Sequence, residues 1–174
     1  MDNPLLVLTG GDPLMRDDVF AIIEYAVQKG VRVSMTPSAT PNVTREAIQS
    51  AKEIGLSRWA FSLDGPTREI HDHFRGTDGS FDLTMKAIRY IHECQLPLQI
   101  NTVISAYNID YLDEMAKLIE ELNCVLWSVF FLVPTGRAKR EDMISPVDHE
   151  KVFLWLSRLA CLLYTSPSPR DRQK

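Results

Sequence analysis

The sequence has few cysteines, no long apolar run and no excess of positive charge, and each absence excludes a class of protein. Its three cysteines lie far apart, and none has a second cysteine or a histidine at metal-ligand spacing. No apolar run is long enough to cross a bilayer, and the short, acidic start is not a signal peptide. The formal net charge of −4 predicts neither a nucleic-acid partner nor a membrane partner. We therefore expect a cytoplasmic globular protein with free thiols.

The composition changes abruptly at Cys161, where an amphipathic pattern gives way to a string rich in Ser, Pro and Arg. The letters LLYTSPSPRD, at 162–171, resemble the conceptual translation of a transposase adapter used in sequencing libraries. A natural disordered tail would have a similar composition. We expect residues 1–160 to form the folded core and residues 161–174 to be an adventitious, disordered tail.

The rest of the chain alternates short apolar runs with amphipathic segments. Short apolar runs that end in turn residues predict strands, and apolar side chains at helical spacing predict helices. The predicted strands are 5–10, 31–35, 58–65, 96–104 and 125–133. The predicted helices are 17–30, 45–55, 81–94, 108–123 and one that begins near Pro146. We expect a loop at 66–80, a buried strand at 5–10, and cover on both faces of the strand 125–133, which is apolar apart from Ser128.

Repeated βα units predict an α/β fold with a parallel sheet, and the periodicity alone is compatible with a barrel or a doubly wound sheet. In both architectures, ligands bind where the strands end at their carboxyl edge. The candidate site residues therefore lie in five short segments. These are 9–13, 34–36, 62–65, 101–103 and 132–136.

The turn after the first strand reads Thr9-Gly10-Gly11-Asp12-Pro13. Glycines allow a ligand to approach the backbone closely, and exposed carbonyl groups accept hydrogen bonds from an ammonium group. The carboxylate of Asp12 also favours a cationic guest. A tight βα turn without a ligand would use the same residues.

The third strand ends in a similar way, with Ser62 and Asp64 at its edge and Arg75 further along the chain. A guanidinium group near Ser62 could bind a carboxylate with paired hydrogen bonds. The alternative for Arg75 is a surface ion pair with Asp72 or Asp78.

Other polar residues at the strand ends indicate a ligand site less strongly. Ser34 and Thr36 are either ligand contacts or turn-forming hydroxyls near Pro37, and Asn101 is a polar residue on an otherwise apolar strand. We expect the histidines His71, His73 and His92 to be solvated.

Taken in order, these segments resemble the radical S-adenosylmethionine (SAM) superfamily, in its branch with C-terminal SPASM domains. The matching strings are TGGDPL, MTPSATP, FSLDGPTREIHDHFRG, NTVI and VLWSVFFLVPTGR. The resemblance implies part of a radical SAM-type partial (β/α) barrel. It also implies that Asp12 stands where Glu is commoner in the family.

The resemblance further implies a role for each strand end in binding SAM. Backbone carbonyls of Thr9–Pro13 would receive the amino group, and Ser62 and Arg75 would hold the carboxylate, with Asp64 beside them. Ser34, Thr36 and Asn101 would lie near the ribose and methionine. The backbone around Leu132 and Val133 would meet the adenine.

The family binds a [4Fe–4S] cluster through a CxxxCxxC loop upstream of the glycine-rich turn, and this motif is absent from the sequence. We therefore expect the chain to be an internal fragment, inactive by itself. The complete enzyme would cleave SAM to a 5'-deoxyadenosyl radical that takes hydrogen from a peptide or small-metabolite substrate. Its electron donor would be a flavodoxin or ferredoxin. The alternatives are a non-catalytic βα binding module with a SAM-like pocket and an unrelated barrel enzyme.

Overall fold

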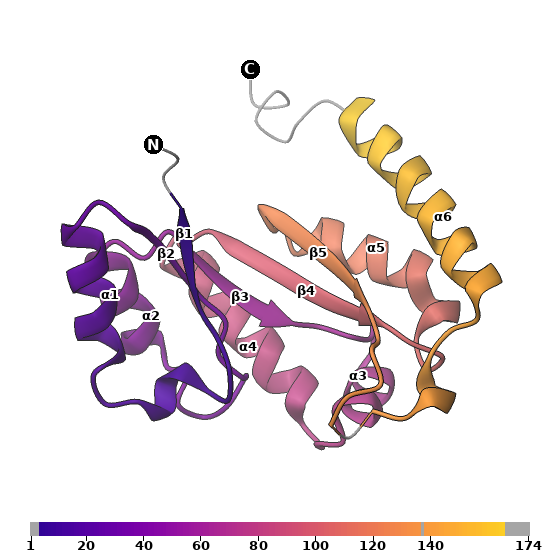
Figure 1. Ribbon diagram of the computed structural model, residues 1–174. Coiled ribbons are helices and arrows are strands. Elements are labelled where there is room, and N and C mark those ends of the chain that lie inside the picture. Colours follow the sequence, from indigo (N-terminus) through magenta and orange to yellow (C-terminus); the bar gives the residue numbers. More distant parts are fainter. Residues whose placement is uncertain (1–3, 137, 166–174) are drawn as a thin grey trace. The chain divides into compact units, whose positions relative to one another are not determined.

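The structure consists of two compact units, which divide between Phe131 and Leu132 (Figure 1). This computed structural model describes residues 4–136 and 138–165. In the first unit the elements follow in the order β1 (Leu5–Leu8), η1 (Pro13–Met15), α1 (Val19–Gln28), β2 (Arg32–Met35), α2 (Arg45–Glu53), β3 (Arg58–Ser62), α3 (Arg68–Arg75), α4 (Ser80–Glu93), β4 (Leu98–Ile104), η2 (Ile109–Tyr111), α5 (Leu112–Glu121) and β5 (Leu126–Phe131), where η marks a short 3₁₀ helix. The second unit holds η3 (Arg140–Asp142) and α6 (Pro146–Thr165). The segment 1–160, which the sequence predicted to be the folded part, therefore contains residues of both units.

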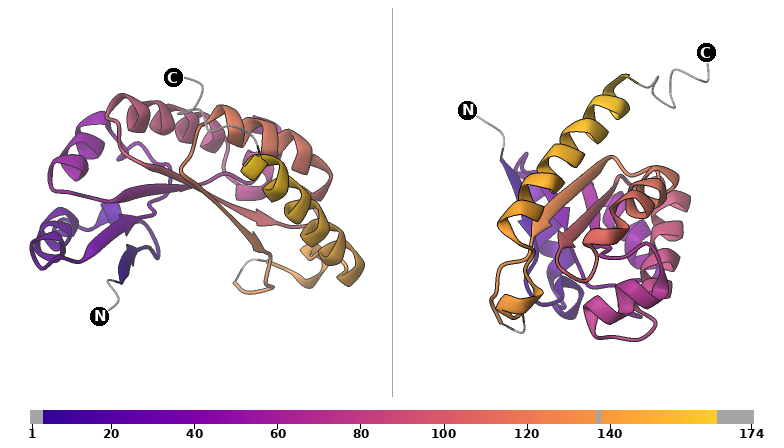
Figure 2. Two further views of the ribbon diagram at one scale, coloured as in Figure 1. Left: turned by 90° about the horizontal axis from the view of Figure 1, so that it is seen from above. Right: turned by 90° about the vertical axis from the view of Figure 1, so that its right-hand side faces the viewer.

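The sheet of the first unit contains five strands, all parallel, in the order β1-β2-β3-β4-β5. A doubly wound sheet reverses its strand order at a switch point, whereas a barrel adds each new strand beside the last. Here the spatial order equals the chain order, so the sheet is of the barrel type. The strands curl into part of a barrel, which confirms the predicted fold class (Figure 2).

The helices of the first unit cover the outer, convex side of this curled sheet (Figure 2). The alternation along β4 shows the consequence most clearly. Every second side chain from Leu98 to Ile104 is buried on the side of the helices, while Gln99 and Asn101 on the other face are partly exposed. On β3, Trp59 and Phe61 are fully buried in the same way. Burial of such large apolar side chains supplies most of the stability of the unit.

The two edge strands are less covered than the sequence predicted. Leu6 and Val7 on β1 are 40% and 46% exposed, so the prediction of a buried first strand is wrong. Phe130 on β5 is 52% exposed, so the prediction of cover on both faces of the strand is also wrong. The physical reason is that an edge strand has a neighbour on one side only, and helices of the first unit cover only one face of the sheet.

The segment predicted as a loop at 66–80 contains the helix α3 instead. It begins after Thr67 and ends before Gly76, which is a typical residue for the end of a helix. Its composition is mostly charged, which hid its apolar contacts: Ile70 and Phe74 are one helical turn apart, and His71 between them is buried. This helix carries Arg75 to the carboxyl edge of the sheet.

Other predicted elements are confirmed with small changes of boundary. The side chain of Thr44 accepts a hydrogen bond from the N–H of Ala47 at 3.1 Å, so it caps α2. The helix α6 begins at Pro146 and continues to Thr165, and so includes the first residues of the segment predicted as a tail. Residues 166–174 lie outside the described residues, and the origin of the tail stays a prediction. No described helix is long and apolar enough to span a membrane.

Candidate functional site

The polar residues predicted on β3 and β4 lie side by side on the concave face of the sheet. Ser62 pairs in register with Asn101, and Asn101 pairs with Ser128 on β5. The amide of Gln99 donates hydrogen bonds to Asn101 Oδ1 at 2.7 Å and to Ser128 Oγ at 3.2 Å. Within the described residues, the hydroxyl group of Ser62 makes no hydrogen bond. This row therefore offers a free hydroxyl and polar amides to a ligand.

The turn after β1 presents free carbonyl groups. Gly10 has a φ of +119°, a conformation that other residues rarely adopt. Among the described residues, no hydrogen bond uses the carbonyl groups of Thr9, Gly10 or Gly11. An added Cβ on Gly10 or Gly11 would meet nothing within 4 Å, so space for a ligand exists beside both. These unpaired acceptors suit an ammonium group, as the sequence predicted.

The carboxylate of Asp12 is used by the turn itself. Its Oδ1 accepts a hydrogen bond from the N–H of Leu14 at 3.1 Å, and its Oδ2 accepts one from the hydroxyl of Thr40 at 3.3 Å. Asp12 thereby caps η1, which begins at Pro13. It adds negative charge close to the free carbonyl groups.

The two hydroxyl residues on and after β2 differ in exposure. Ser34 is 1% exposed and lies in register with Val7 on β1 and with Arg58, which is at the other end of β3 from Ser62. Thr36 follows β2 and is partly exposed, and its N–H donates to the carbonyl of Leu8 at 2.9 Å. Thr36 thus lies at the same edge as the turn after β1.

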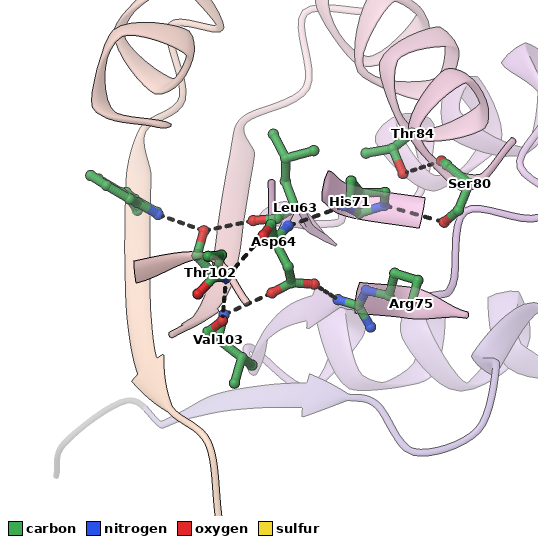
Figure 3. A network of polar contacts seen from close by, with 10 residues as sticks. Leu63, Asp64, His71, Arg75, Ser80, Thr84, Thr102 and Val103 are labelled. Carbon is green, nitrogen blue, oxygen red and sulfur yellow. Dashed lines mark hydrogen bonds and ion pairs between the residues drawn. The ribbon is translucent and has the colours of Figure 1, made fainter. Parts of the chain in front are cut away.

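Asp64 follows β3 and is completely buried, and each of its polar groups has a partner (Figure 3). Its Oδ1 accepts a hydrogen bond from the N–H of Val103 at 2.7 Å, and its Oδ2 pairs with Arg75 Nη2 at 2.6 Å. Its N–H donates to Nδ1 of His71 at 3.1 Å, and its carbonyl accepts from the amide of Asn108 at 2.9 Å. Burial raises the pKa of the Asp64 carboxyl, against the opposing effects of Arg75 and Val103.

Arg75 lies at the end of α3 with its side chain 34% exposed. The sequence left open an ion pair with Asp72 or Asp78, but the partner of Arg75 is Asp64. Asp72 instead accepts hydrogen bonds from the N–H groups of Gly79 and Phe81, both at 2.7 Å, and so caps α4. A guanidinium group has five N–H donors, and the pair with Asp64 is the only polar contact of Arg75 within the described residues. The remaining donors suit a carboxylate ligand.

His71 is 1% exposed, so the prediction of a solvated histidine is wrong for this residue. Because Nδ1 accepts the N–H of Asp64, the ring carries its proton on Nε2, which lies 3.2 Å from the hydroxyl of Ser80 (Figure 3). Burial, with a smaller contribution from the positive charge of Arg75, lowers the pKa of His71 to about 4. His71 is therefore a neutral acceptor near neutral pH.

Two further side chains fix the ends of β3 and β4. One is Asn108, which sequence reasoning did not assign, and the other is Thr102, which lies in the candidate segment 101–103. The buried amide of Asn108 donates to the carbonyl groups of Asp64 and Val103, and its oxygen accepts from the N–H of Ser105 at 2.9 Å. The hydroxyl of Thr102 donates to the carbonyl of Leu63 at 2.7 Å and accepts from the indole N–H of Trp127 at 2.9 Å. The carboxyl ends of these strands are thus held by buried side chains.

The donor and acceptor sets fit the two ends of an amino acid such as the methionine part of SAM. Free carbonyl groups lie after β1, while the hydroxyl of Ser62 and the guanidinium of Arg75 lie at the end of β3. Leu132 and Val133, predicted near the adenine, belong to the second unit, and their contact stays a prediction.

The described residues do not fit an iron–sulfur cluster. No group of three or more His, Cys, Asp or Glu side chains in the described part of the chain could hold a metal ion. Cys94 is buried, Cys124 is half-buried, and burial raises the pKa of the Cys124 thiol. This raised pKa of Cys124 is the opposite of the low pKa typical of a metal-binding thiol.

The fold is a partial (β/α) barrel whose strand ends carry free carbonyl groups and a guanidinium, a set of groups that suits a small zwitterion. The sequence model of the radical SAM superfamily matches residues 4–119, and the chain belongs to this family of enzymes. Family membership implies SAM and a [4Fe–4S] cluster as cofactors.

Curated relatives and solved structures agree with this family. The chain is 41% identical over 155 residues to an AdoMet-dependent heme synthase of Nitratidesulfovibrio vulgaris, covering 88% of the chain and 42% of the relative. It is 40% identical over 153 residues to an AdoMet-dependent heme synthase of Methanosarcina barkeri, covering 88% and 44%. The structure of Streptococcus suis SuiB bound to SAM matches with a TM-score of 0.74 at 16% identity, covering 88% and 36%. The chain thus spans less than half of each.

Proposed function

We propose that the strand-end site binds SAM, and that the complete protein containing this chain is a radical SAM enzyme. The observation that carries this proposal is the opposite polarity of two parts of one sheet edge, at β1 and β3, which the strand β2 separates. Three free carbonyl groups follow β1, and a guanidinium with unused donors lies at the end of β3. The methionine part of SAM carries an ammonium and a carboxylate on one carbon atom, and these two sets of groups would recognise the two charges.

Each predicted residue has a place in this proposal. The turn Thr9–Pro13 receives the ammonium group, and Ser62 and Arg75 bind the carboxylate. The polar side chains of Ser34, Thr36 and Asn101 lie along the methionine and ribose, and Leu132 and Val133 meet the adenine. When bound and reduced by one electron, SAM supplies the 5'-deoxyadenosyl radical that takes hydrogen from the substrate. The chain's own groups orient the methionine end and exclude water from it.

The substrate we propose is a tetrapyrrole, a small metabolite, and not a peptide. This choice is supported by the heme synthases at 41% and 40% identity, whereas the likeness to SuiB at 16% identity concerns the fold alone. The electron donor in this proposal is a flavodoxin or a ferredoxin, which the chain itself does not identify.

The role of the site can be tested by SAM affinity, measured by calorimetry on the complete, anaerobically reconstituted protein. Arg75→Ala removes charged hydrogen bonds to the carboxylate and is expected to weaken binding about 10- to 100-fold. Arg75→Lys keeps the charge but loses the planar fork, so it should restore only part of the affinity. Asp12→Ala removes a negative charge near the ammonium group and should weaken binding about 5-fold.

Arg68 provides a matched control, because it lies on the same helix and is exposed, where it pairs with Asp82 at 2.8 Å. Arg68→Ala should leave SAM affinity unchanged. Unchanged affinity in both Arg75→Ala and Asp12→Ala would contradict the site assignment. Tight SAM binding without any turnover of the reconstituted protein would favour the alternative, a non-catalytic binding module.

We propose further that residues 1–160 are an internal piece of the complete enzyme and that 161–174 derive from a sequencing adapter. Long-read sequencing of the genomic locus tests both parts. We expect the reading frame to continue upstream through a CxxxCxxC motif and to diverge from CLLYTSPSPRD after Ala160. A genomic frame that reads through to Lys174 unchanged would refute the adapter origin.

A further inference from the structure

We infer that Asp64 is a positioning residue that orients the guanidinium of Arg75 toward the bound carboxylate and does not itself touch the ligand. The inference rests on the proposed function, because it concerns the same SAM-carboxylate site. It departs from the expectation that Asp64 belongs among the direct cofactor contacts. Three observations about Asp64, concerning its burial, its partners and its surroundings, carry the inference.

The first observation is that Asp64 has no exposed surface and no unengaged oxygen. Its side chain is 0% exposed, and its two carboxylate oxygens bind the N–H of Val103 and the guanidinium of Arg75. A ligand carboxylate would also be repelled by a carboxylate at this position. Direct contact with the acidic end of SAM is therefore disfavoured on both steric and electrostatic grounds.

The second observation is that the ion pair with Asp64 uses only one part of the Arg75 guanidinium. Asp64 contacts Arg75 through one terminal nitrogen at 2.6 Å, and the Arg75 side chain remains 34% exposed. An arginine side chain has many rotamers, and fixing it before binding removes an entropic cost from the binding step. A buried anion at one edge of the guanidinium leaves the other donors available in a fixed direction.

The third observation is that Asp64 is itself held by buried side chains from other parts of the chain. His71 accepts its N–H, Asn108 donates to its carbonyl, and both of these side chains are 1% exposed. His71 on α3 and Asn108 after β4 thus hold the backbone of Asp64, while Val103 on β4 holds one oxygen of its carboxylate (Figure 3). The other oxygen, Oδ2, has the ion pair with Arg75 and no hydrogen bond among the described residues. A buried carboxylate fixed in this way can orient a ligand-binding group.

The experiment compares SAM affinity in the complete, reconstituted protein with the thermal stability of the same samples. Asp64→Asn keeps an oxygen that can accept from Val103 and keeps both backbone hydrogen bonds, but its amide cannot pair with a guanidinium. We expect it to weaken SAM binding about 10-fold. The double variant Asp64→Asn/Arg75→Ala should bind no more weakly than Arg75→Ala alone, because the two residues act as a unit.

A second readout uses added methylguanidinium, at a concentration too low to unfold the protein. It should partly restore SAM binding in Arg75→Ala, where the Asp64 carboxylate remains to hold it, and should not do so in the double variant. A purely structural role for Asp64 would not produce this difference. Asp72→Asn is the matched control, because Asp72 lies on α3 and only caps α4; it should lower stability without changing affinity.

The outcomes separate this inference from the proposed function. If Asp64→Asn lowers stability but binds SAM as the wild type does, or if the two substitutions add fully, the positioning role is overturned. If Arg75→Ala itself leaves SAM affinity unchanged, the proposed site fails first, and the Asp64 variants then carry no information about SAM.

Discussion

Replacing Gly65 with alanine is expected to lower the free energy of unfolding by about 3 kcal/mol or more, the largest effect on stability that the described structure predicts. Gly65 comes directly after Asp64, where the first turn of α3 packs against the chain. An added Cβ would lie 2.5 Å from the backbone nitrogen of His71 and 2.7 Å from Cγ2 of Ile70. A backbone atom cannot move aside as a flexible side chain can, so α3 itself would have to shift.

The measurement is equilibrium urea unfolding of the chain, followed by circular dichroism, with the midpoint compared at equal slope. Gly11→Ala is the matched control, because its added Cβ would meet nothing within 4 Å and its φ is not positive. That substitution should change stability by less than about 0.5 kcal/mol. Equal midpoints for Gly65→Ala and the wild type would show that α3 does not pack at Gly65 as described.

Acidification is expected to destabilise the wild-type chain through His71 by about 3 kcal/mol between pH 6.5 and pH 4. The folded state holds His71 neutral, with a pKa of about 4 instead of the ordinary 6.5. In this interval the unfolded chain binds a proton that the folded chain does not, so the stability from neutral His71 is fully present above pH 6.5. It falls as the pH drops and is lost once the pH passes below 4.

The test of this prediction is the difference between two proteins, so that other titrating groups cancel. His71→Asn keeps an oxygen near the position of Nδ1, which can accept the N–H of Asp64, but it has no proton to gain. Urea unfolding at several pH values should show a steep loss in the wild type and a shallower one in the variant. Parallel pH profiles would mean that His71 titrates normally in the folded state.

The opposing titration of Asp64 is common to both proteins. Its pKa is raised by burial, so protonation favours the folded state in the acidic range, opposite in sign to His71. This contribution reduces the total acid sensitivity of the chain. Because Arg75 and Val103 face Asp64 in both proteins, it does not account for the expected difference between them.

The sequence was sufficient for the fold class because strand and helix signals are local. Short apolar runs, the Thr44 cap and the amphipathic helices depend on near neighbours, and their predicted positions agree with the structure to within a few residues. The barrel-type strand order required the structure, because the same βα periodicity serves both a barrel and a doubly wound sheet.

The network around Asp64 could not be predicted because it depends on partners chosen in three dimensions. The sequence offered Asp72 and Asp78 as partners of Arg75, and only folding shows that Asp72 caps α4 and that Arg75 pairs with Asp64. His71 stands in a charged segment, and nothing local indicates that its ring is buried. Asn108 lies far along the chain from Asp64, and only the pairing of β3 with β4 brings them together.

The two faces of β4 differ in how well they tolerate substitution. Substitutions at Leu98 or Ile100 would empty the core and be removed by selection for stability. Substitutions at Gln99, Asn101 or Ser128 lie on the half-exposed face and change only the lining that a bound molecule meets. A lineage with this sheet can therefore acquire a new specificity by exchanging one side of its strands while the other side, and the architecture that depends on it, is inherited unchanged.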